Sequence, residues 1–338
     1  MKIGIMSFAH THASTYASLL RGRDDVELLA ADPGGHRANE LRGRALAESM
    51  GVPYVDSYEE LLEWGPEAVI ITSENAKHRE LVEIAAAAGA HILCEKPLAT
   101  TWADGQAIQA AVERNGVLLM VAYPVRFASD FARLRTEHDA GLLGEIVSIR
   151  GSNNGKLPLE RSWFTEPELS GGGALVDHVV HIADLIEALT GAEPERVTAV
   201  SNAILHSERA RAETAGLVTI EYADGIVATV DCSWSVPESA PTWGGVRISV
   251  AATRGTTELD FFGPAVRGID ALTGRPLVRP YGPSLDETML GAFLTAVRAG
   301  RQPEVSLQSG LRTLSIVLAA QESARTGTSV AVCAMTSG

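Results

Sequence analysis

The first third of the chain alternates short apolar runs with longer stretches in which apolar residues recur every three or four positions. Short apolar runs bounded by polar residues are typical of strands, and the longer period is typical of amphipathic helices. The expected strands are Lys2 to Met6, Val26 to Ala31, Ala68 to Thr72, His91 to Cys94 and Val117 to Val121. The expected helices are Ser14 to Leu20, Arg37 to Met50, Tyr58 to Trp64, Lys77 to Ala88 and Trp102 to Asn115. This order predicts an α/β, Rossmann-type doubly wound parallel sheet, which binds ligands at the carboxyl ends of its strands.

The pattern changes after about Tyr123, where longer strands of alternating polarity follow one another without helices between them. They are Ile146 to Gly151, Val197 to Ala203, Leu217 to Tyr222, Ile226 to Cys232, Arg247 to Ala252 and Thr256 to Phe261. Turn sequences such as Ala223-Asp224-Gly225 join neighbouring strands as hairpins. Helical patterns at Gly173 to Leu189, Leu285 to Ala299 and Ser309 to Thr326 are expected to cover one face of this sheet. We therefore predict a dinucleotide-binding domain over residues 1–122 and a C-terminal α+β domain with a large, mainly antiparallel sheet over residues 123–338.

Composition and charge narrow the class of protein. The chain has 338 residues, 46% of them hydrophobic and 21% charged, which is typical of a folded protein with two domains. Its formal net charge of -14 repels phosphate backbones, so we expect no nucleic-acid partner. The apolar stretches are too short to span a bilayer, which predicts no membrane partner. The chain has too few and too scattered cysteines for a disulfide framework: Cys94, Cys232 and Cys333. Because no targeting segment is apparent either, we expect a cytoplasmic protein.

Two motifs carry candidate chemistry. The run His91 to Leu98 contains Glu95-Lys96-Pro97 directly after a strand, and Pro97 restrains the lysine at the carboxyl edge of the sheet. Lys96 there can contact a substrate hydroxyl, whereas the simpler interpretation is a surface Glu-Lys pair in a turn. The second motif is a triple glycine, Gly171 to Gly173, ahead of a helix that carries Asp177 and His181 four residues apart on one face. A histidine suits the proton transfer that accompanies hydride transfer, although such a pair is more often a helix-face hydrogen bond.

In their order and spacing these motifs resemble the glucose-fructose oxidoreductase / inositol dehydrogenase / MocA (Gfo/Idh/MocA) family. The resemblance extends over nearly the whole chain, from Ser73-Glu74-Asn75 with His78, through Glu95-Lys96-Pro97 and Arg126-Phe127, to the triple glycine with Asp177 and His181. It implies an NAD(P)-dependent oxidoreductase that transfers a hydride between a nicotinamide and a sugar- or cyclitol-like secondary alcohol. It also implies that Lys96, Asp177 and His181 are catalytic, with His181 as the acid/base, and that the protein is a homodimer or homotetramer.

The turn after the first strand departs from that family's glycine-rich pattern. In place of Gly-x-Gly-x-x-Gly the chain reads Ser7-Phe8-Ala9-His10-Thr11-His12, so that Ser7, Ala9 and His12 occupy the three glycine positions. Serine and alanine preserve much of the turn, but a histidine at the third position alters the strand–helix packing or the path of the loop. Asp32, at the end of the second strand, is expected to accept hydrogen bonds from the adenosine ribose, which favours NAD, while Arg37 keeps NADP open.

The expected sites follow from these observations. Cofactor contacts are assigned to Ser7, Phe8, Ala9, His10, His12, Asp32, Ser73, Asn75, His78, Glu95 and Lys96. Substrate contacts are assigned to Lys96, Arg126, Asn154, Trp163, Asp177, His178 and His181, and no metal is expected.

Two alternatives stay open. The missing glycines suggest a family-like protein that binds a sugar or a partner without dehydrogenase turnover. The sequence His10-Thr11-His12 suggests a metal-dependent hydrolase, because His-x-His pairs can place two imidazoles on one metal. Such a hydrolase barrel would continue as strand–helix repeats to the end of the chain. The pattern after Tyr123 argues against it, because strands there follow one another without helices between them.

Overall fold

The structure is a computed structural model that describes residues 1–34 and 40–332 and divides into two compact units. Unit 1 comprises residues 1–122, 158–171 and 286–314, and unit 2 comprises residues 123–157, 172–285 and 315–338. Arg37 and Cys333, both used in the sequence analysis, lie outside the described residues. Within the described ranges, none of the helices combines the length and the apolarity that crossing a membrane requires.

Unit 1 is built on a parallel sheet of six strands in the order β3-β2-β1-β4-β5-β6, which confirms the doubly wound prediction. The strands are β1 (Lys2–Met6), β2 (Glu27–Ala31), β3 (Tyr54–Val55), β4 (Ala68–Ile71), β5 (His91–Cys94) and β6 (Leu119–Val121). The helices that connect them are α1 (His12–Arg21), α2 (Gly43–Met50), α3 (Tyr58–Glu63), α4 (His78–Ala87) and α5 (Trp102–Asn115). The central strands are almost entirely buried, because helices on both faces of a parallel sheet leave little of it to water.

Local sequence signals explain where these helices begin and end. The hydroxyl of Thr101 accepts a hydrogen bond from the amide of Asp104 and so begins α5, and Gly116 ends it in the left-handed conformation. Ser57 begins α3 in the same way by accepting from the amide of Glu60. These ends fix the lengths of the helices, and the carboxyl ends of the strands come out together at one edge of the sheet.

Unit 2 contains a sheet of seven strands in the order β12-β11-β7-β10-β9-β8-β15. The strands are β7 (Ile146–Gly155), β8 (Pro194–Asn202), β9 (Ala215–Tyr222), β10 (Val227–Ser233), β11 (Gly244–Ala252), β12 (Gly255–Asp260) and β15 (Val330–Ala331). Neighbouring strands are antiparallel except β7 and β10, which pair in parallel, so the sheet is mainly antiparallel as predicted.

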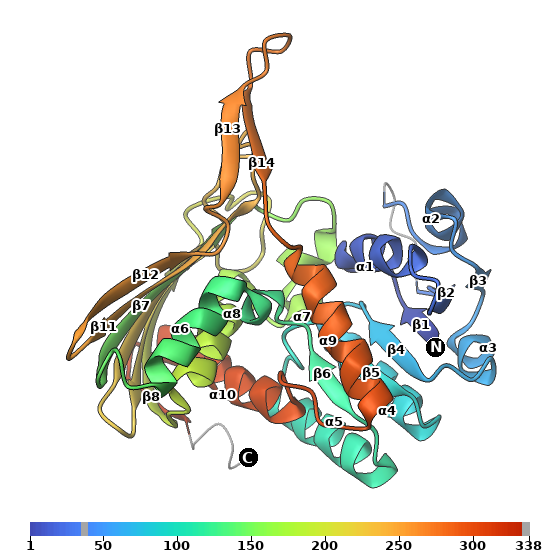
Figure 1. Cartoon of the computed structure of the whole chain (residues 1–338), viewed down its shortest axis with the longest axis horizontal. Coiled ribbons are helices and arrows are strands. Elements are labelled where there is room, and N and C mark those ends of the chain that lie inside the picture. Colours follow the sequence, from blue (N-terminus) through green and yellow to red (C-terminus); the bar gives the residue numbers. More distant parts are fainter. Residues whose placement is uncertain (35–39, 333–338) are drawn as a thin grey trace. The chain divides into compact units, whose positions relative to one another are not determined.

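Helices and short elements complete the two units. In unit 2 the long helix α8 (Ala174–Thr190) lies so close to β7 that a Cβ atom on Gly151 would come within 2.3 Å of the Ile182 side chain. Unit 2 also contains α6 (Ser129–Asp139) and the hairpin of β13 (Ala265–Ile269) and β14 (Pro276–Pro280), which projects beyond the end of β12 in Figure 1. Unit 1 also holds α7 (Pro167–Ser170), and α10 (Leu307–Thr326) contributes to both units.

The structure corrects one expectation about helix placement. The sequence analysis placed Leu285 to Ala299 over the second sheet, but α9 (Leu285–Ala299) belongs, from Asp286 onward, to unit 1. The chain returns there because the segment after α9 pairs with β6: the amide of Val121 donates to the carbonyl of Val305 at 3.2 Å. Periodicity shows that a helix is amphipathic but not which sheet its apolar face covers.

Candidate functional site

The turn between β1 and α1 keeps the backbone shape of a glycine turn without its glycines. Ser7 has a φ of 77°, a left-handed value that side chains other than glycine seldom adopt. The Ser7 hydroxyl accepts a hydrogen bond from the amide of Ala9 at 3.2 Å, which holds the turn in this shape. The small side chains of Ser7 and Ala9 therefore preserve the turn, as the sequence predicts.

The amides of this turn already donate to acceptors within unit 1. The amide of His10 donates to the carbonyl of Thr72 at 2.8 Å, and the amide of His12 donates to Nδ1 of His10 at 3.1 Å. The acceptors of the Ala9 and His12 amides are side-chain atoms, so rotation of Ser7 or His10 releases them without a change in the backbone. A pyrophosphate held by helix N-terminal amides needs such a release here.

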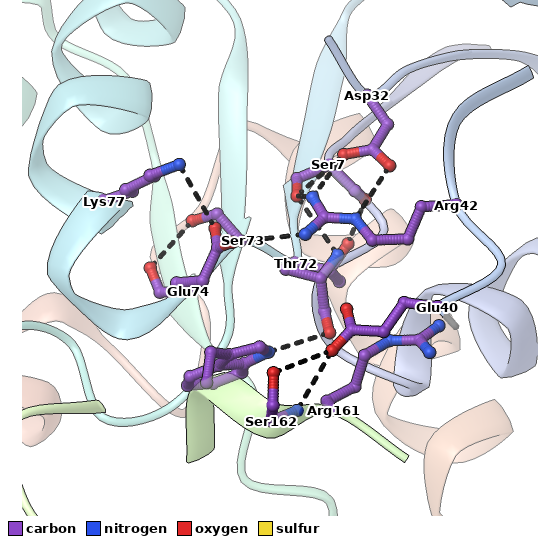
Figure 2. A network of polar contacts seen from close by, with 12 residues as sticks. Ser7, Asp32, Glu40, Arg42, Thr72, Ser73, Glu74, Lys77, Arg161 and Ser162 are labelled. Atoms are coloured by element: carbon purple, nitrogen blue, oxygen red, sulfur yellow. Dashed lines mark hydrogen bonds and ion pairs between the residues drawn. The ribbon is translucent and has the colours of Figure 1, made fainter. Parts of the chain in front are cut away.

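Asp32, at the carboxyl end of β2, lies in a buried network with Arg42 and Glu74 (Figure 2). The Arg42 guanidinium donates to both carboxylate oxygens of Asp32, at 2.6 and 3.1 Å, and to Glu74 at 3.2 Å. Burial alone raises the pKa of Asp32, but the hydrogen bonds and charge of Arg42 outweigh it and hold that pKa below its usual value. The carboxylate also accepts from the amide of Gly43 at 2.9 Å and from the Ser7 hydroxyl at 3.3 Å. The side chain expected to bind the ribose is therefore fully engaged within the protein.

Trp163, a predicted substrate contact, lies against the same turn. Its side chain is fully buried, its ring stacks on Phe164 with centroids 3.9 Å apart, and its Nε1 donates to the carbonyl of Ala9 at 3.0 Å. Such a ring has no exposed face on which a sugar can stack. In the structure Trp163 packs on the turn of unit 1 with Phe164 and Leu169, and its assignment as a substrate contact stays a prediction.

The end of β4 carries three polar side chains that the sequence assigned to cofactor binding, and all three are buried. The hydroxyl of Ser73 donates to the carbonyl of Glu74. Asn75 donates from Nδ2 to the carbonyl of Ser170 at 2.8 Å, and His78 is bonded through Nδ1 to the carbonyl of Pro97 at 2.9 Å. In the described part of the chain, Oδ1 of Asn75 and Nε2 of His78 are buried with no hydrogen-bond partner. Orphaned polar atoms of this kind are expected where a polar ligand completes the bonding.

The end of β5 carries Glu95 and Lys96, both buried. One carboxylate oxygen of Glu95 lies 2.9 Å from Nδ1 of His12 and accepts from the hydroxyl of Tyr16 at 2.8 Å. Burial alone raises the pKa of Glu95, but the neighbouring His10, His12 and Lys96 hold it well below its usual range. Glu95 also raises the pKa of His12, against the opposing effect of burial. The structure thus joins the altered turn to the lysine motif through one carboxylate.

Unit 2 supplies the second motif at the start of α8. A Cβ atom on Gly173 would lie 1.9 Å from the backbone oxygen of Glu213, so a glycine is needed for this close approach. The Glu213 side chain accepts from the amides of Gly173 and Leu175 at 2.8 and 3.1 Å and so caps the helix.

Asp177 follows in the first turn of α8, where its Oδ2 accepts from Nε1 of Trp234 and lies 3.0 Å from Nε2 of His178. His181 is one helical turn further along, with its ring 5.7 Å from that of Tyr123. The helix thus presents a carboxylate and an imidazole in the predicted order, with His178 as the neighbour that pairs with Asp177.

The remaining predicted substrate residues in unit 2 have structural partners. Arg126 donates to both carboxylate oxygens of Asp184, at 2.6 and 2.9 Å, and both side chains are buried. Oδ1 of Asn154 accepts from the Ser233 hydroxyl at 2.7 Å. The ion pair accounts for Arg126 without any ligand, because a buried guanidinium requires a carboxylate partner.

Sequence reasoning missed four residues of these sites: Tyr16, Arg42, Glu213 and, as a partner of Asp177, Trp234. Arg42 lies ten positions after Asp32, and Glu213 lies far from the helix that it caps, so no spacing rule connects either pair. Tyr16 lies four positions after His12 and shares a helix face with it in α1, but the predicted helix began only at Ser14, so the sequence did not connect the two residues.

The residues of unit 1 fit a dinucleotide once side chains rotate. The turn has the required backbone shape, and Asn75 and His78 offer unfilled polar atoms at the carboxyl edge of the sheet. Binding requires Arg42 to release Asp32 and His10 to release the amide of His12.

Comparison with known proteins identifies the two halves of the chain separately. The oxidoreductase family GFO/IDH/MocA, described as an NAD-binding Rossmann fold, matches residues 3–123. The GFO/IDH/MocA C-terminal domain matches residues 131–258.

Several curated relatives match over most of their length. A 1,5-anhydro-D-fructose reductase from Ensifer adhaerens is 28% identical over 85% of this chain and 86% of its own. A myo-inositol 2-dehydrogenase from Thermotoga maritima is 26% identical over 96% of both chains. A D-xylose 1-dehydrogenase (NADP(+)) from Haloferax volcanii is 29% identical over 86% of this chain and 89% of its own.

Solved structures share the fold over the whole chain. GenD2 from gentamicin A biosynthesis, solved in complex with NAD, has a TM-score of 0.86 at 24% identity and covers 98% of this chain and 96% of its own. An aldose-aldose oxidoreductase from Caulobacter crescentus, solved with glycerol, has a TM-score of 0.80 at 25% identity and covers 98% of this chain and 99% of its own.

Proposed function

Since the chain belongs to the GFO/IDH/MocA family of NAD-binding oxidoreductases, we propose that it oxidises or reduces one secondary alcohol of a sugar- or cyclitol-like substrate. NAD is the proposed cofactor and NADP the alternative. The substrate class is supported by relatives named for anhydrofructose, xylose and inositol.

Three residues take the chemical roles in this proposal. Lys96 holds the substrate oxygen, His181 accepts the hydroxyl proton during oxidation, and Asp177 orients the substrate. The carbon–hydrogen bond breaks as a hydride and the substrate becomes a carbonyl compound. NAD, when bound, supplies the hydride acceptor. The observation that carries the proposal is the fixed position of Asp177, which Trp234 and His178 contact at the start of α8.

The first experiment is isothermal titration with NAD, NADH, NADP and NADPH, followed by a screen of sugars and cyclitols for formation of NADH absorbance. Lys96→Met is then expected to lower kcat by about a hundredfold or more, the usual scale for loss of a donor that stabilises the reacting oxygen. Lys2→Met is the matched control, because Lys2 begins β1 at the opposite edge of the same sheet and donates to the carbonyl of Trp64. Normal turnover by the Lys96 variant on an identified substrate would refute these roles.

A relative that binds a sugar or partner without turnover is the second candidate. It is favoured by one observation: Asp32 and the turn amides are bonded within unit 1. Failure of all four dinucleotides to bind would select it. A hydrolase built as strand–helix repeats does not agree with the sheet of unit 2.

We also propose a homodimer or homotetramer in a reducing, cytoplasmic setting. Val200 and Leu217 are opposite each other on β8 and β9 with 64% and 51% of their surfaces exposed, and such an apolar pair on an open sheet face suits a partner subunit. Cys94 and Cys232 are buried free thiols. Light scattering after size-exclusion chromatography tests the assembly, and a monomeric mass would refute it.

A further inference from the structure

We propose that His10, His12 and Glu95 form a binding site for one divalent transition-metal ion of the zinc class. The site lies at the carboxyl edge of the sheet in unit 1, and it departs from the sequence-based expectation of no metal. The inference does not rest on the proposed oxidoreductase function, because it concerns a donor set that hydride transfer does not require.

The geometry of the three donors supports the site. Each side chain offers one ligand atom, and these atoms all lie within 4.8 Å of one another. Zinc bonds to nitrogen and oxygen measure about 2.0–2.2 Å, so tetrahedral ligands are about 3.4 Å apart. The imidazole rings of His10 and His12 are already 4.2 Å apart between centroids, and Nδ1 of His12 is 2.9 Å from Glu95. Small rotations of the side chains would bring the three ligand atoms to this separation, and a water molecule would take the fourth position.

The fold holds these donors in place. His10 and His12 come from the turn after β1, where the amide of His10 is bonded to the carbonyl of Thr72 beyond the end of β4. Glu95 follows β5 directly, and its amide is bonded to the carbonyl of Ile71. Donors at the ends of strands in one sheet keep their relative positions, which preorganises a metal site.

The surroundings suit a cation of this class. Two imidazoles and one carboxylate are a donor set that zinc takes in open sites with three protein ligands. The Tyr16 hydroxyl donates to Glu95 at 2.8 Å and so orients the carboxylate, as outer-shell partners do around metals. Asp286, at the start of α9, is close enough to interact electrostatically with His12 and adds negative charge, whereas Lys96 opposes a cation.

A metal ion can reach the site from solvent. His12 has 34% of its side chain exposed, while Glu95 is buried at 1%, so an ion can enter from the His12 side. Without an ion, a hydrogen bond between His12 and Glu95 occupies this position. Metal binding would replace this hydrogen bond, with Glu95 and one ring nitrogen of His12 each bonding to the ion instead.

The test uses full-length protein without a polyhistidine tag, stripped of metal and titrated with Co²⁺ by absorption spectroscopy and with Zn²⁺ by calorimetry. We expect one ion per chain, with the visible cobalt band of a four- or five-coordinate site. His12→Gln, His10→Gln and Glu95→Gln should each weaken binding at least tenfold. His138→Gln is the control, because His138 lies in α6 of unit 2, and it should leave the affinity unchanged.

Absence of stoichiometric binding, or binding that His12→Gln does not weaken, would overturn the proposal and leave a hydrogen-bonded cluster only. His12→Gln is decisive, since its partly exposed side chain makes loss of folding the smallest concern among the three variants. Dinucleotide titration of the same metal-free protein reports on the proposed function separately. The metal titration and the dinucleotide titration therefore test the metal site and the oxidoreductase function independently.

Discussion

The guanidinium of Arg42 donates to both carboxylate oxygens of Asp32, from Nη2 at 2.6 Å and from Nε at 3.1 Å. Both side chains are almost completely buried, with 1% and 0% exposed. Asp32 was expected to bind the adenosine ribose, and a bidentate partner neutralises the charge that would reject a 2'-phosphate. By pairing with Asp32, Arg42 removes the free negative charge on which the predicted preference for NAD over NADP was based.

Replacing Arg42 is therefore expected to change cofactor preference. Arg42→Met removes the cation and leaves Asp32 as a carboxylate without a cationic partner, so the ratio of NAD to NADP affinity should rise about tenfold, the size of one charge-assisted hydrogen bond. Calorimetric titration with both dinucleotides measures the ratio. Arg44→Met is the control, because Arg44 is exposed and pairs with Asp56. An unchanged ratio in Arg42→Met would show that Asp32 does not contact the cofactor.

The same pair is expected to govern stability in acid. The pKa of Asp32 is lower in the folded protein than in the unfolded chain, so its contribution is present above about pH 4 and is lost as pH falls through the folded value. Asp32→Asn should lower the free energy of unfolding by about 3 kcal/mol near pH 7, where a buried charge loses its partner. The difference from the natural protein should shrink as the pH falls below 4, as measured by guanidinium denaturation.

An exposed aspartate provides the comparison for that experiment. Asp56→Asn breaks only a surface pair with Arg44 and is expected to cost less than about 1 kcal/mol at any pH. A loss of equal size in Asp32→Asn and Asp56→Asn would contradict the assigned role of the buried pair.

Periodicity predicted most strands of the two sheets, because local hydrophobic pattern determines them, but it missed the two-residue strands β3 (Tyr54–Val55) and β15 (Val330–Ala331). The predicted strand Lys2 to Met6 and helix Trp102 to Asn115 agree with β1 and α5 at both ends. What the pattern could not predict depends on contacts between distant segments. The placement of α9 in unit 1, the parallel pairing of β7 with β10 and the β13–β14 hairpin are of this kind.

The candidate sites show the same division. Glycine and charge motifs located Lys96, Asp177 and His181 as candidates, whose roles remain predictions. The hydrogen-bond partners of the site residues could not be predicted, because they come from other segments of the chain. These partners are Arg42 for Asp32, Glu95 for His12, and Trp234 for Asp177.

Arg126 allows a direct test of a structural against a substrate-binding role. Arg126→Met and Asp184→Asn should each lower the free energy of unfolding by about 3–5 kcal/mol, because each leaves a buried charge without its partner. The double variant should lose less than the sum of the two, as measured by a double-mutant cycle. A rise in KM confined to Arg126→Met, with Asp184→Asn normal, would instead identify Arg126 as a substrate ligand.

Trp234 is expected to position Asp177. Its indole Nε1 donates to Oδ2 of Asp177 at 3.0 Å, and the ring is fully buried, so Trp234→Phe removes the hydrogen bond while keeping most of the packing. Loss of one such bond to a charged group costs about 1.5 kcal/mol, which corresponds to a fall in kcat of about tenfold with little change in KM if the carboxylate acts in the transition state. Trp243→Phe, with a half-exposed ring in the same unit, should leave both constants unchanged. If Trp234→Phe and Trp243→Phe changed kcat by the same factor and KM by the same factor, the contact of Trp234 with Asp177 would serve packing alone.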